Sequence, residues 1–333
     1  MDQFRMEEIS FELVGKVLEQ DIVSEYDVLL LKKGSILTVT NILLLKKHDY
    51  KQIKVSEDRS FQKLYSKNIE NIENLFSDLT SIQGIDIKEW FNQDKKLVRF
   101  IQRDDSFLEQ MYKSKDETTL FHHSANVGLI AFFLGKLLRY SFNNKVLLWQ
   151  MGVLHDIGKL KLRNELISKQ ESLTVEEFQE YKQHPELGWE ILREVKGVNA
   201  QILNAARHHH ERIDGSGYPK GLKVKYLPVM VQIISVANEI DKILMAGGNT
   251  FDLINRLVED TRLNKLNPAI VIPFVRHLLR KHVGEQVVLS DETKGEIVFV
   301  FDHEPSQPLI YLNDSDTFLD LRTEHNKKIV NFA

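Results

Sequence analysis

The chain has 333 residues, 42% of them apolar and 28% charged, and its 44 basic and 48 acidic side chains leave a formal net charge of −4. This composition predicts a globular protein of two or three domains, and the small net charge argues against binding of a nucleic-acid polymer. The absence of cysteine excludes disulfides, thiolate metal sites and cysteine nucleophiles. No apolar run approaches the roughly 20 residues of a membrane-spanning helix, and no signal pattern opens the chain, so we expect a cytoplasmic protein without a membrane partner.

Residues 1–57 predict a small α+β module. Strand-like runs at 13–18, 28–31 and 52–55 accompany a helical segment at 38–48. We expect this module to serve regulation or docking.

Residues 58–115 predict a helical connector, because apolar residues recur at helical spacing in a polar segment. Such helices could pair with a second copy of the chain in a homodimer.

Residues 116–282 predict an all-helical main domain, with Pro185, Pro228 and Pro268 at helix boundaries. Residues 283–333 predict a short β appendage, because the runs 286–289, 295–300 and 308–312 are strand-like. The predicted fold class is therefore mainly α: a helical bundle with a small N-terminal α+β module and a short C-terminal β appendage.

Seven of the twelve histidines lie between residues 122 and 210. Among them, His155 precedes Asp156 at the end of an apolar helical run, where both are costly to bury unless they are paired or bind a metal. Imidazole and carboxylate suit iron, manganese, zinc or cobalt. Asp156 could bridge two ions, as in two-metal phosphoesterases. Lys159 would lie on the same face of a continuing helix and offer a positive charge to a phosphate.

A glycine-rich loop follows His209 and His210. Gly215 and Gly217 allow positive φ or close backbone approach, and Pro219 fixes its own φ. The pattern predicts a defined loop over residues 214–221. Its Tyr218 would stack on a base or pack against a partner, although a purely structural turn is the alternative.

Four segments together resemble the HD-GYP family in order and spacing: FHHSANV at 121–127, LHDIGK at 154–159, HPELG at 184–188 and HHERIDGSGYPKGL at 209–222. The resemblance covers about residues 116–282. It implies a helical HD-domain bundle whose dinuclear or trinuclear metal centre hydrolyses cyclic di-GMP, a cyclic dinucleotide of bacterial signalling, to pGpG or GMP through a metal-bound hydroxide.

The resemblance also implies roles for individual residues. Asp156 and Lys159 would be catalytic, with Asp156 bridging the ions and Lys159 contacting substrate phosphate. The metal ligands would be His123, His155, Asp156, His184, His209 and His210, with Asn238 at the position of the last ligand. The substrate or partner loop would comprise Asp214, Gly215, Gly217, Tyr218 and Pro219. The resemblance implies that this loop also docks to a diguanylate cyclase (GGDEF) domain.

The extra carboxylate of trinuclear members would stand at Thr119, so we expect two ions rather than three. They would be divalent transition-metal ions, iron or manganese first, with zinc, cobalt and nickel also compatible.

Two departures from the family pattern bear on activity. Asn238 replaces the last metal-binding aspartate, so the site has one negative charge less and should bind one ion more weakly. Residues 245–250, where the family carries basic residues that meet the dinucleotide, contain no arginine or lysine. Lys242 or Arg256 are candidates to replace them.

Three interpretations follow. The first is a metal-dependent phosphodiesterase acting on cyclic di-GMP or a related cyclic dinucleotide. The second is a catalytically impaired HD-GYP protein that acts as a nucleotide-binding or protein-docking signalling module. The third is another HD phosphohydrolase, acting on nucleotides or guanosine tetraphosphate.

Overall fold

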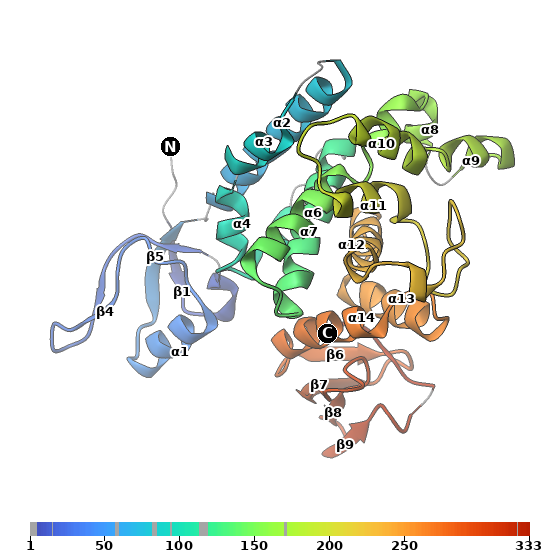
Figure 1. The fold of residues 1–333 in the computed structure, drawn as a ribbon. Coiled ribbons are helices and arrows are strands. Elements are labelled where there is room, and N and C mark those ends of the chain that lie inside the picture. Colours follow the sequence, from blue (N-terminus) through green and yellow to red (C-terminus); the bar gives the residue numbers. More distant parts are fainter. Residues whose placement is uncertain are drawn as a thin grey trace. The chain divides into compact units, whose positions relative to one another are not determined.

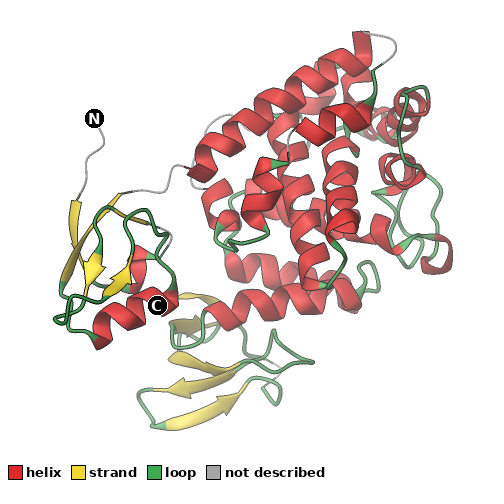
Figure 2. Ribbon diagram, turned by 60° about the vertical axis from the view of Figure 1, so that its left-hand side comes forward, coloured by secondary structure: helices red, strands yellow, loops and turns green. Residues whose placement is uncertain are grey.

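The computed structural model describes residues 5–14, 16–56, 60–81, 85–93, 95–112, 119–169, 172–324 and 326–333. The chain forms two compact units, residues 1–67 with 104–111 and residues 68–103 with 112–333. Figure 2 shows strands in the first unit and in the C-terminal part of the second, while helices make up the rest. The predicted domain boundaries at 57/58 and 115/116 lie outside the described residues.

The first unit contains a three-stranded antiparallel sheet in the order β1 (Arg5–Glu8), β5 (Gln52–Ser56), β2 (Val17–Leu18). A hairpin of β3 (Ile22–Val23) and β4 (Leu29–Leu31), the 3-10 turn η1 (Phe11–Leu13), α1 (Val39–Lys47) and α5 (Phe107–Met111) complete it. Its core includes Leu18, Ile42, Leu45 and Ile53, all fully buried. The strand expected at 13–18 is confined to β2, because residues 11–13 form the 3-10 turn.

Helix α2 (Ser60–Ser81) runs from the first unit into the second. Its apolar stripe is buried within the chain at Ile72, Leu75 and Phe76, and the ring of Phe76 meets Phe121 edge-on at 5.8 Å. The stripe therefore needs no second subunit to cover these side chains, and the homodimer stays a prediction.

Three helices form the centre of the second unit: α6 (Leu120–Leu137), α7 (Phe142–Leu154) and α12 (Val229–Met245) (Figure 1). Helices α6 and α7 pack backbone to backbone, since a Cβ on Gly152 would lie 2.6 Å from Gly128 Cα. This approach brings the first turn of α6 close to the end of α7.

The remaining helical elements of the second unit surround this centre. They are α3 (Ile87–Gln93), α4 (Lys96–Ile101), η2 (Ile157–Lys161), α8 (Asn164–Ser168), α9 (Val175–Tyr181), α10 (His184–Arg193), α11 (Ala200–His208), η3 (Val224–Tyr226), α13 (Thr250–Arg262) and α14 (Pro268–Lys281). Pro185 and Pro268 lie in the first turns of α10 and α14, and Pro228 is the N-cap of α12, as expected of residues that lack a backbone N–H.

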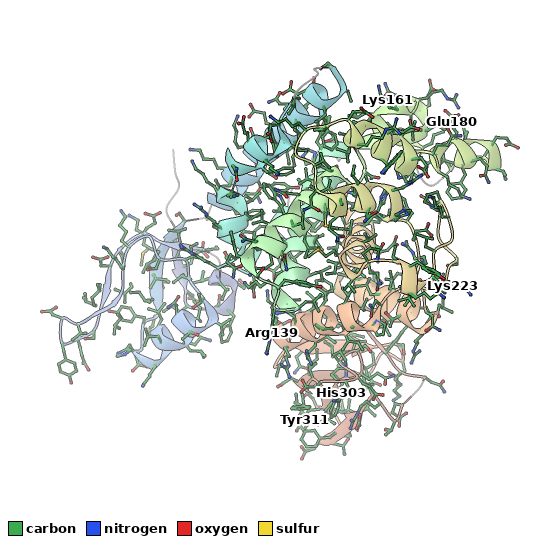
Figure 3. All side chains as sticks on the ribbon, in the orientation of Figure 1. Arg139, Lys161, Glu180, Lys223, His303 and Tyr311 are labelled. Carbon is green, nitrogen blue, oxygen red and sulfur yellow. The ribbon has the colours of Figure 1, made fainter. Side chains whose placement is uncertain are left out.

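The C-terminal strands form one antiparallel sheet in the order β10-β6-β7-β8-β9. Its members are β6 (Gln286–Leu289), β7 (Lys294–Phe299), β8 (Leu309–Leu312), β9 (Thr317–Asp320) and β10 (Ile329–Phe332). Figure 3 labels Tyr311 on β8, whose ring lies 5.4 Å from that of Phe318 on β9. Phe332 of β10 packs 4.8 Å from Phe251 of α13. The strands β6, β7 and β8 were predicted from the sequence, whereas β9 and β10 were not.

The predicted fold class is confirmed: the chain is mainly α, with small sheets near its two ends. Among the described residues, the helices are either too short or too polar to cross a bilayer.

Candidate metal centre

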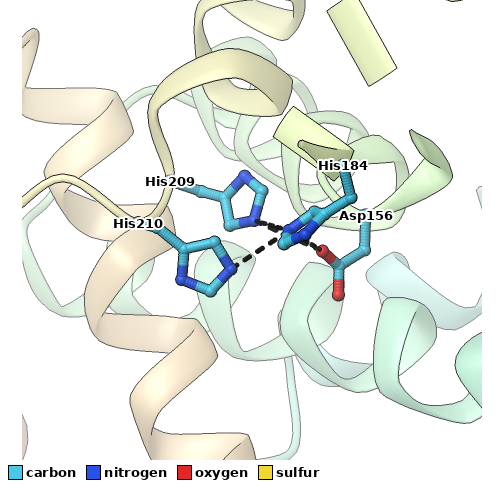
Figure 4. A group of neighbouring side chains, drawn as sticks. All are labelled: Asp156, His184, His209 and His210. Atoms are coloured by element: carbon cyan, nitrogen blue, oxygen red, sulfur yellow. Dashed lines mark hydrogen bonds and ion pairs between the residues drawn. The ribbon is translucent and has the colours of Figure 1, made fainter. Parts of the chain in front are cut away.

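Six of the seven predicted ligand side chains come together in the second unit, from four segments of the chain. His123 lies in the first turn of α6, His155 and Asp156 follow α7, His184 begins α10, and His209 and His210 follow α11. Their donor atoms form two groups, each with separations within 4.8 Å. The first group is His123, His155 and Asp156, and the second, drawn in Figure 4, is Asp156, His184, His209 and His210. All six side chains are buried.

Asp156 belongs to both groups and turns one oxygen toward each. Its Oδ2 lies 3.2 Å from His123 Nε2 and 3.3 Å from His155 Nε2. Its Oδ1 lies 3.2 Å from His184 Nε2 and 3.3 Å from His209 Nε2. A carboxylate in this arrangement could bridge two ions, and the bridging role of Asp156 stays a prediction.

Backbone carbonyls fix the orientation of three of these imidazoles. The Nδ1 atom of His155 donates to Gly152 O at 2.6 Å, and that of His184 donates to Tyr181 O at 2.6 Å. His209 Nδ1 approaches Ala205 O at 3.0 Å. A carbonyl only accepts, so each Nδ1 carries the proton and each Nε2 presents a lone pair, the form in which histidine binds metals.

The protonation of the second group suits side chains that share one cation. His184 Nε2 and His209 Nε2 lie 3.2 Å apart, and neither carries a proton that could join them. His210 Nε2 approaches His184 Nε2 at 3.1 Å. Donor atoms that share one ion at about 2.1 Å are separated by about 3–4 Å. The separations within this group therefore suit ligands of one ion better than direct contacts between imidazole nitrogens.

Burial keeps most of these imidazoles neutral. It lowers the pKa of His155 and of His184, lowers that of His209 to about 3, and is the main reason that the pKa of His210 falls well below its ordinary value. Neutral imidazole is the ligating form, so these side chains are ready to bind without first losing a proton.

His123 differs from them. Burial lowers its pKa, but hydrogen bonds to Asp156 and Asp241 outweigh burial and raise it.

Lys159 is almost fully buried, at 3% exposure, and its Nζ lies 2.6 Å from Asp156 Oδ2. Burial lowers its pKa, but the Asp156 carboxylate more than offsets this and the net pKa is raised. Burial would raise the pKa of Asp156, yet His155 and Lys159 hold it well below its ordinary value. The helix does not continue through Lys159, since α7 ends at Leu154 and the 3-10 turn η2 follows. Three residues per turn still place Lys159 beside Asp156.

Asp241 belongs to this centre and was not predicted as a site residue from the sequence. Its Oδ2 accepts from His123 Nδ1 at 2.6 Å, and its Oδ1 accepts from Asn126 Nδ2 at 2.8 Å and from the Tyr112 hydroxyl. A carboxylate behind a ligating histidine fixes its orientation and raises its basicity. The available signal was the spacing, since Asp241 follows Asn238 by one helical turn.

Asn238 is 1% exposed on α12, three residues after Ser235 and three before Asp241. Residues at this spacing share one helix face. Ser235 Oγ donates to His209 O and Asp241 contacts His123, so the face of Asn238 is turned toward both groups. Within the described residues neither Oδ1 nor Nδ2 of Asn238 has a hydrogen-bond partner. An unsatisfied buried amide is destabilising by about 1–3 kcal/mol per group, so its carbonyl oxygen is free to serve an ion.

Thr119 is the N-cap of α6, and its hydroxyl accepts a hydrogen bond from His122 N. A capping hydroxyl at this position offers no negative charge to a third ion.

Glu211, which follows His210 directly, connects the predicted loop to the second group through hydrogen bonds. The Glu211 carboxylate, 1% exposed, accepts from Lys220 N at 2.8 Å and from Leu222 N at 2.9 Å. Asp214 Oδ1 accepts from Ser216 N at 2.9 Å, and Gly215 has a φ of +88°. The backbone of Lys223, a residue labelled in Figure 3, forms an isolated antiparallel β-bridge with that of Asp214 where the loop closes.

Tyr218 turns inward from this loop. Its ring stacks on His210 with 4.5 Å between centroids and 16° between planes. Gly217 allows this approach, since a Cβ there would lie 2.4 Å from His210 O. Tyr218 thus packs against His210, a candidate ligand, and its expected contact with a base or a partner stays a prediction. Pro219 follows it in the loop, and docking to a diguanylate cyclase stays a prediction. His208 lies outside both groups, 3.8 Å from Glu211 Oε1.

The two proposed replacements for the missing basic residues differ in placement. Arg256 lies on α13, is 65% exposed and pairs with Asp260 at 3.4 Å. Lys242 lies on α12, one turn after Asn238, and pairs with Glu239 at 3.5 Å. Only Lys242 continues the face of α12 that meets the two groups.

Comparisons with known proteins show what the segment around this centre is similar to. Residues 109–249 match the sequence model of a family described as HD domain. The cyclic di-GMP phosphodiesterase PA4108 of Pseudomonas aeruginosa is 31% identical over 152 residues, 44% of this chain and 36% of that protein. A cyclic di-GMP phosphodiesterase of Thermotoga maritima is 43% identical over 89 residues, 26% of this chain and 24% of that protein.

A 3'3'-cGAMP-specific phosphodiesterase 1 of Vibrio cholerae is 30% identical over 148 residues, 44% of this chain and 34% of that protein. The matched segments thus span little more than a third of these three relatives at most. Among solved structures, Bd1817, an HDG"Y"P protein from Bdellovibrio bacteriovorus, aligns with a TM-score of 0.55 and 19% identity over 84% of this chain and 100% of that chain. At this identity the likeness concerns the fold.

Proposed function

Because the chain belongs to the HD-GYP family, we propose that its metal centre hydrolyses a phosphodiester bond of a cyclic dinucleotide. Relatives are cyclic di-GMP phosphodiesterases and a 3'3'-cGAMP-specific phosphodiesterase. Cyclic di-GMP is the first substrate to test, with linear pGpG or GMP as products.

The observation that carries the proposal is the pair of Nε2 lone pairs of His184 and His209, which face each other at 3.2 Å beside the shared carboxylate of Asp156. We propose two ions. His123, His155, Asp156 and the Asn238 carbonyl would hold one, and Asp156, His184, His209 and His210 the other. Nitrogen and oxygen donors without thiolate favour iron or manganese, with zinc, cobalt and nickel as alternatives. When bound, such ions supply Lewis acidity and an activated water for phosphodiester hydrolysis.

The protein's own residues prepare the site for an anionic substrate. Lys159 is held protonated beside Asp156 and would neutralise charge that develops on the phosphate. Asp241 and the backbone carbonyls hold the imidazoles in one orientation. Tyr218 covers one face of His210 and limits water on that side.

Hydrolysis is tested by incubating manganese-loaded or iron-loaded protein with cyclic di-GMP and 3'3'-cGAMP and separating the products chromatographically. We expect a linear dinucleotide from the wild type and a loss of more than about a hundredfold in Asp156→Asn. Asp302→Asn, an exposed aspartate far along the chain, is the matched control and should behave as wild type. A protein that retains two ions but releases no linear product from either substrate contradicts the proposal.

The second candidate is a catalytically impaired HD-GYP protein that binds nucleotide or a partner. It is favoured by the neutral amide of Asn238 at the position of a charged ligand. Asn238→Asp separates the two. A large gain in metal occupancy and turnover supports impairment, whereas unchanged or lower turnover supports a working site that uses the asparagine.

A further inference from the structure

One carboxylate beside the metal centre forms ion pairs with two basic side chains. Glu239 Oε1 pairs with Arg212 Nη2 and lies 3.5 Å from Lys242 Nζ. Arg212 follows His210 by two residues, and Glu239 follows Asn238 directly. We call these three side chains the Glu239 triad.

The triad carries a net charge of +1 at a site with limited water. The side chains of Arg212 and Glu239 are 16% and 15% exposed, and that of Lys242 is 38% exposed. A partly buried cation that shares its only carboxylate with an arginine is incompletely neutralised. Among the described residues, Glu239 is the carboxylate with which Lys242 forms an ion pair. An anionic ligand would neutralise the remaining positive charge of the triad.

The position of Lys242 points it toward the metal centre. Ser235, Asn238 and Lys242 follow one another at spacings of three and four residues, which place them along one stripe of α12. The stripe begins at Ser235, whose hydroxyl contacts His209 O, and ends at the partly exposed ammonium of Lys242.

A cyclic dinucleotide carries two phosphodiesters, and only one of them can lie on the two groups of ligands at a time. The second needs a cation at the rim, but residues 245–250 supply none. We propose that Lys242, held with Arg212 by Glu239, binds the phosphate that is not being cleaved. This inference rests on the proposed function, since it names the residue that holds the second half of the same substrate.

The test compares Lys242→Ala and Lys242→Arg with Arg256→Ala, an exposed cation paired on α13, in protein loaded with manganese. For Lys242→Ala we expect the KM and the Kd for cyclic di-GMP to rise about tenfold to hundredfold, the loss of one charge-assisted hydrogen bond. Metal content should stay unchanged. Lys242→Arg should restore most of the affinity, and Arg256→Ala should match wild type.

A second substrate separates a phosphate-binding role from a structural one. Bis(p-nitrophenyl) phosphate has a single phosphodiester, so its kcat/KM should be the same in wild type and Lys242→Ala. A parallel fall for both substrates, or an unchanged Kd for cyclic di-GMP, overturns the inference and leaves the proposed function intact. Binding is measured by calorimetry independently of turnover, so a wild type that binds without hydrolysis still tests Lys242. A wild type that neither binds nor hydrolyses any cyclic dinucleotide overturns both.

Discussion

Asp241 holds His123 from behind, with 2.6 Å between Asp241 Oδ2 and His123 Nδ1, while the Nε2 atom of the same ring faces Asp156. The carboxylate is fully buried and also accepts hydrogen bonds from Asn126 and Tyr112. His123 is therefore oriented by a side-chain carboxylate, whereas His155, His184 and His209 are oriented by backbone carbonyls.

Asp241→Asn should weaken metal binding at the first group about tenfold to hundredfold, because an amide neither fixes the Nδ1 proton nor raises the basicity of the ring as a carboxylate does. Elemental analysis after dialysis against limiting manganese measures the effect, and Asp291→Asn on the surface is the control. Full occupancy in Asp241→Asn at limiting metal would falsify the role assigned to Asp241.

Removal of metal should lower the thermal stability of the protein, because the facing imidazole lone pairs and the buried carboxylate then lose their cation. At a free ion concentration a hundred times the Kd, the ions stabilise the folded state by about 2.7 kcal/mol per site. Differential scanning calorimetry with and without chelator measures the shift in Tm. The shift should disappear in Asp156→Asn, and a shift that persists there would place the stabilising ion elsewhere.

Acid should destabilise the metal-free protein between about pH 6.5 and 3. Burial lowers the pKa of His209 from its ordinary value of 6.5 to about 3, and it also lowers that of His155 and His184. In this window the unfolded chain binds protons that the folded chain does not, so the free energy of unfolding falls as pH falls. Each such histidine contributes up to about 1.4 kcal/mol per pH unit.

The dependence is measured by chemical denaturation of chelator-treated protein at several pH values. His209→Asn removes one of the titrating groups and should flatten the slope below pH 6.5. An equal slope in wild type and His209→Asn contradicts the assignment of a depressed pKa to this imidazole.

Gly158→Ala should destabilise the fold by at least about 1–3 kcal/mol and misplace His184. A Cβ on Gly158 would lie 1.9 Å from His184 O and 2.4 Å from Gly188 N, which are backbone atoms that cannot rotate away. Gly188→Ala is the matched control, because its Cβ would meet nothing closer than 3.3 Å. Urea denaturation of both variants checks the difference, and equal stabilities would mean that η2 and α10 separate at little cost.

Glu211→Gln should loosen the loop over residues 214–221 by about 1–3 kcal/mol, because the amide nitrogen cannot accept from Lys220 N or Leu222 N. Hydrogen exchange of peptides from this loop should become faster, while exchange in α6 and α7 should not change. Glu194→Gln, whose carboxylate lies on the exposed end of α10, serves as control. Unchanged exchange in the loop would show that the glycines and Pro219 hold it without Glu211.

The histidines, Asp156 and the glycine-rich loop could be recognised from the sequence because each belongs to a short contiguous motif. His155 and Asp156 are neighbours, and His209 and His210 adjoin the loop. The strand-like runs likewise predicted three strands of the C-terminal sheet. These features depend on local spacing, which a sequence displays directly.

Other features depend on contacts between distant segments. Asp241 contacts His123 across 118 positions of the chain, so no local pattern reveals the pair. Glu211 was passed over because its partners are backbone N–H groups, which every residue has. The strands β9 and β10 were missed because they are short, and β9 is exposed or half-buried along its length. The close approach of Gly158 to α10 is likewise a tertiary contact, which local spacing does not reveal.

The spacing of the proposed ligands has a consequence for the topology of the chain. Asp156 and His184 are 28 positions apart in the chain, and His184 and His209 are 25 positions apart. Nevertheless, His184 Nε2 lies 3.2 Å from Asp156 Oδ1 and 3.2 Å from His209 Nε2. Ions held by these side chains would join segments of the main domain as covalent crosslinks do. They would close loops and so lower the conformational entropy that the chain gains on unfolding. In a protein without cysteine, the catalytic ions would thus also be its crosslinks, and loss of metal would release the fold and the activity together.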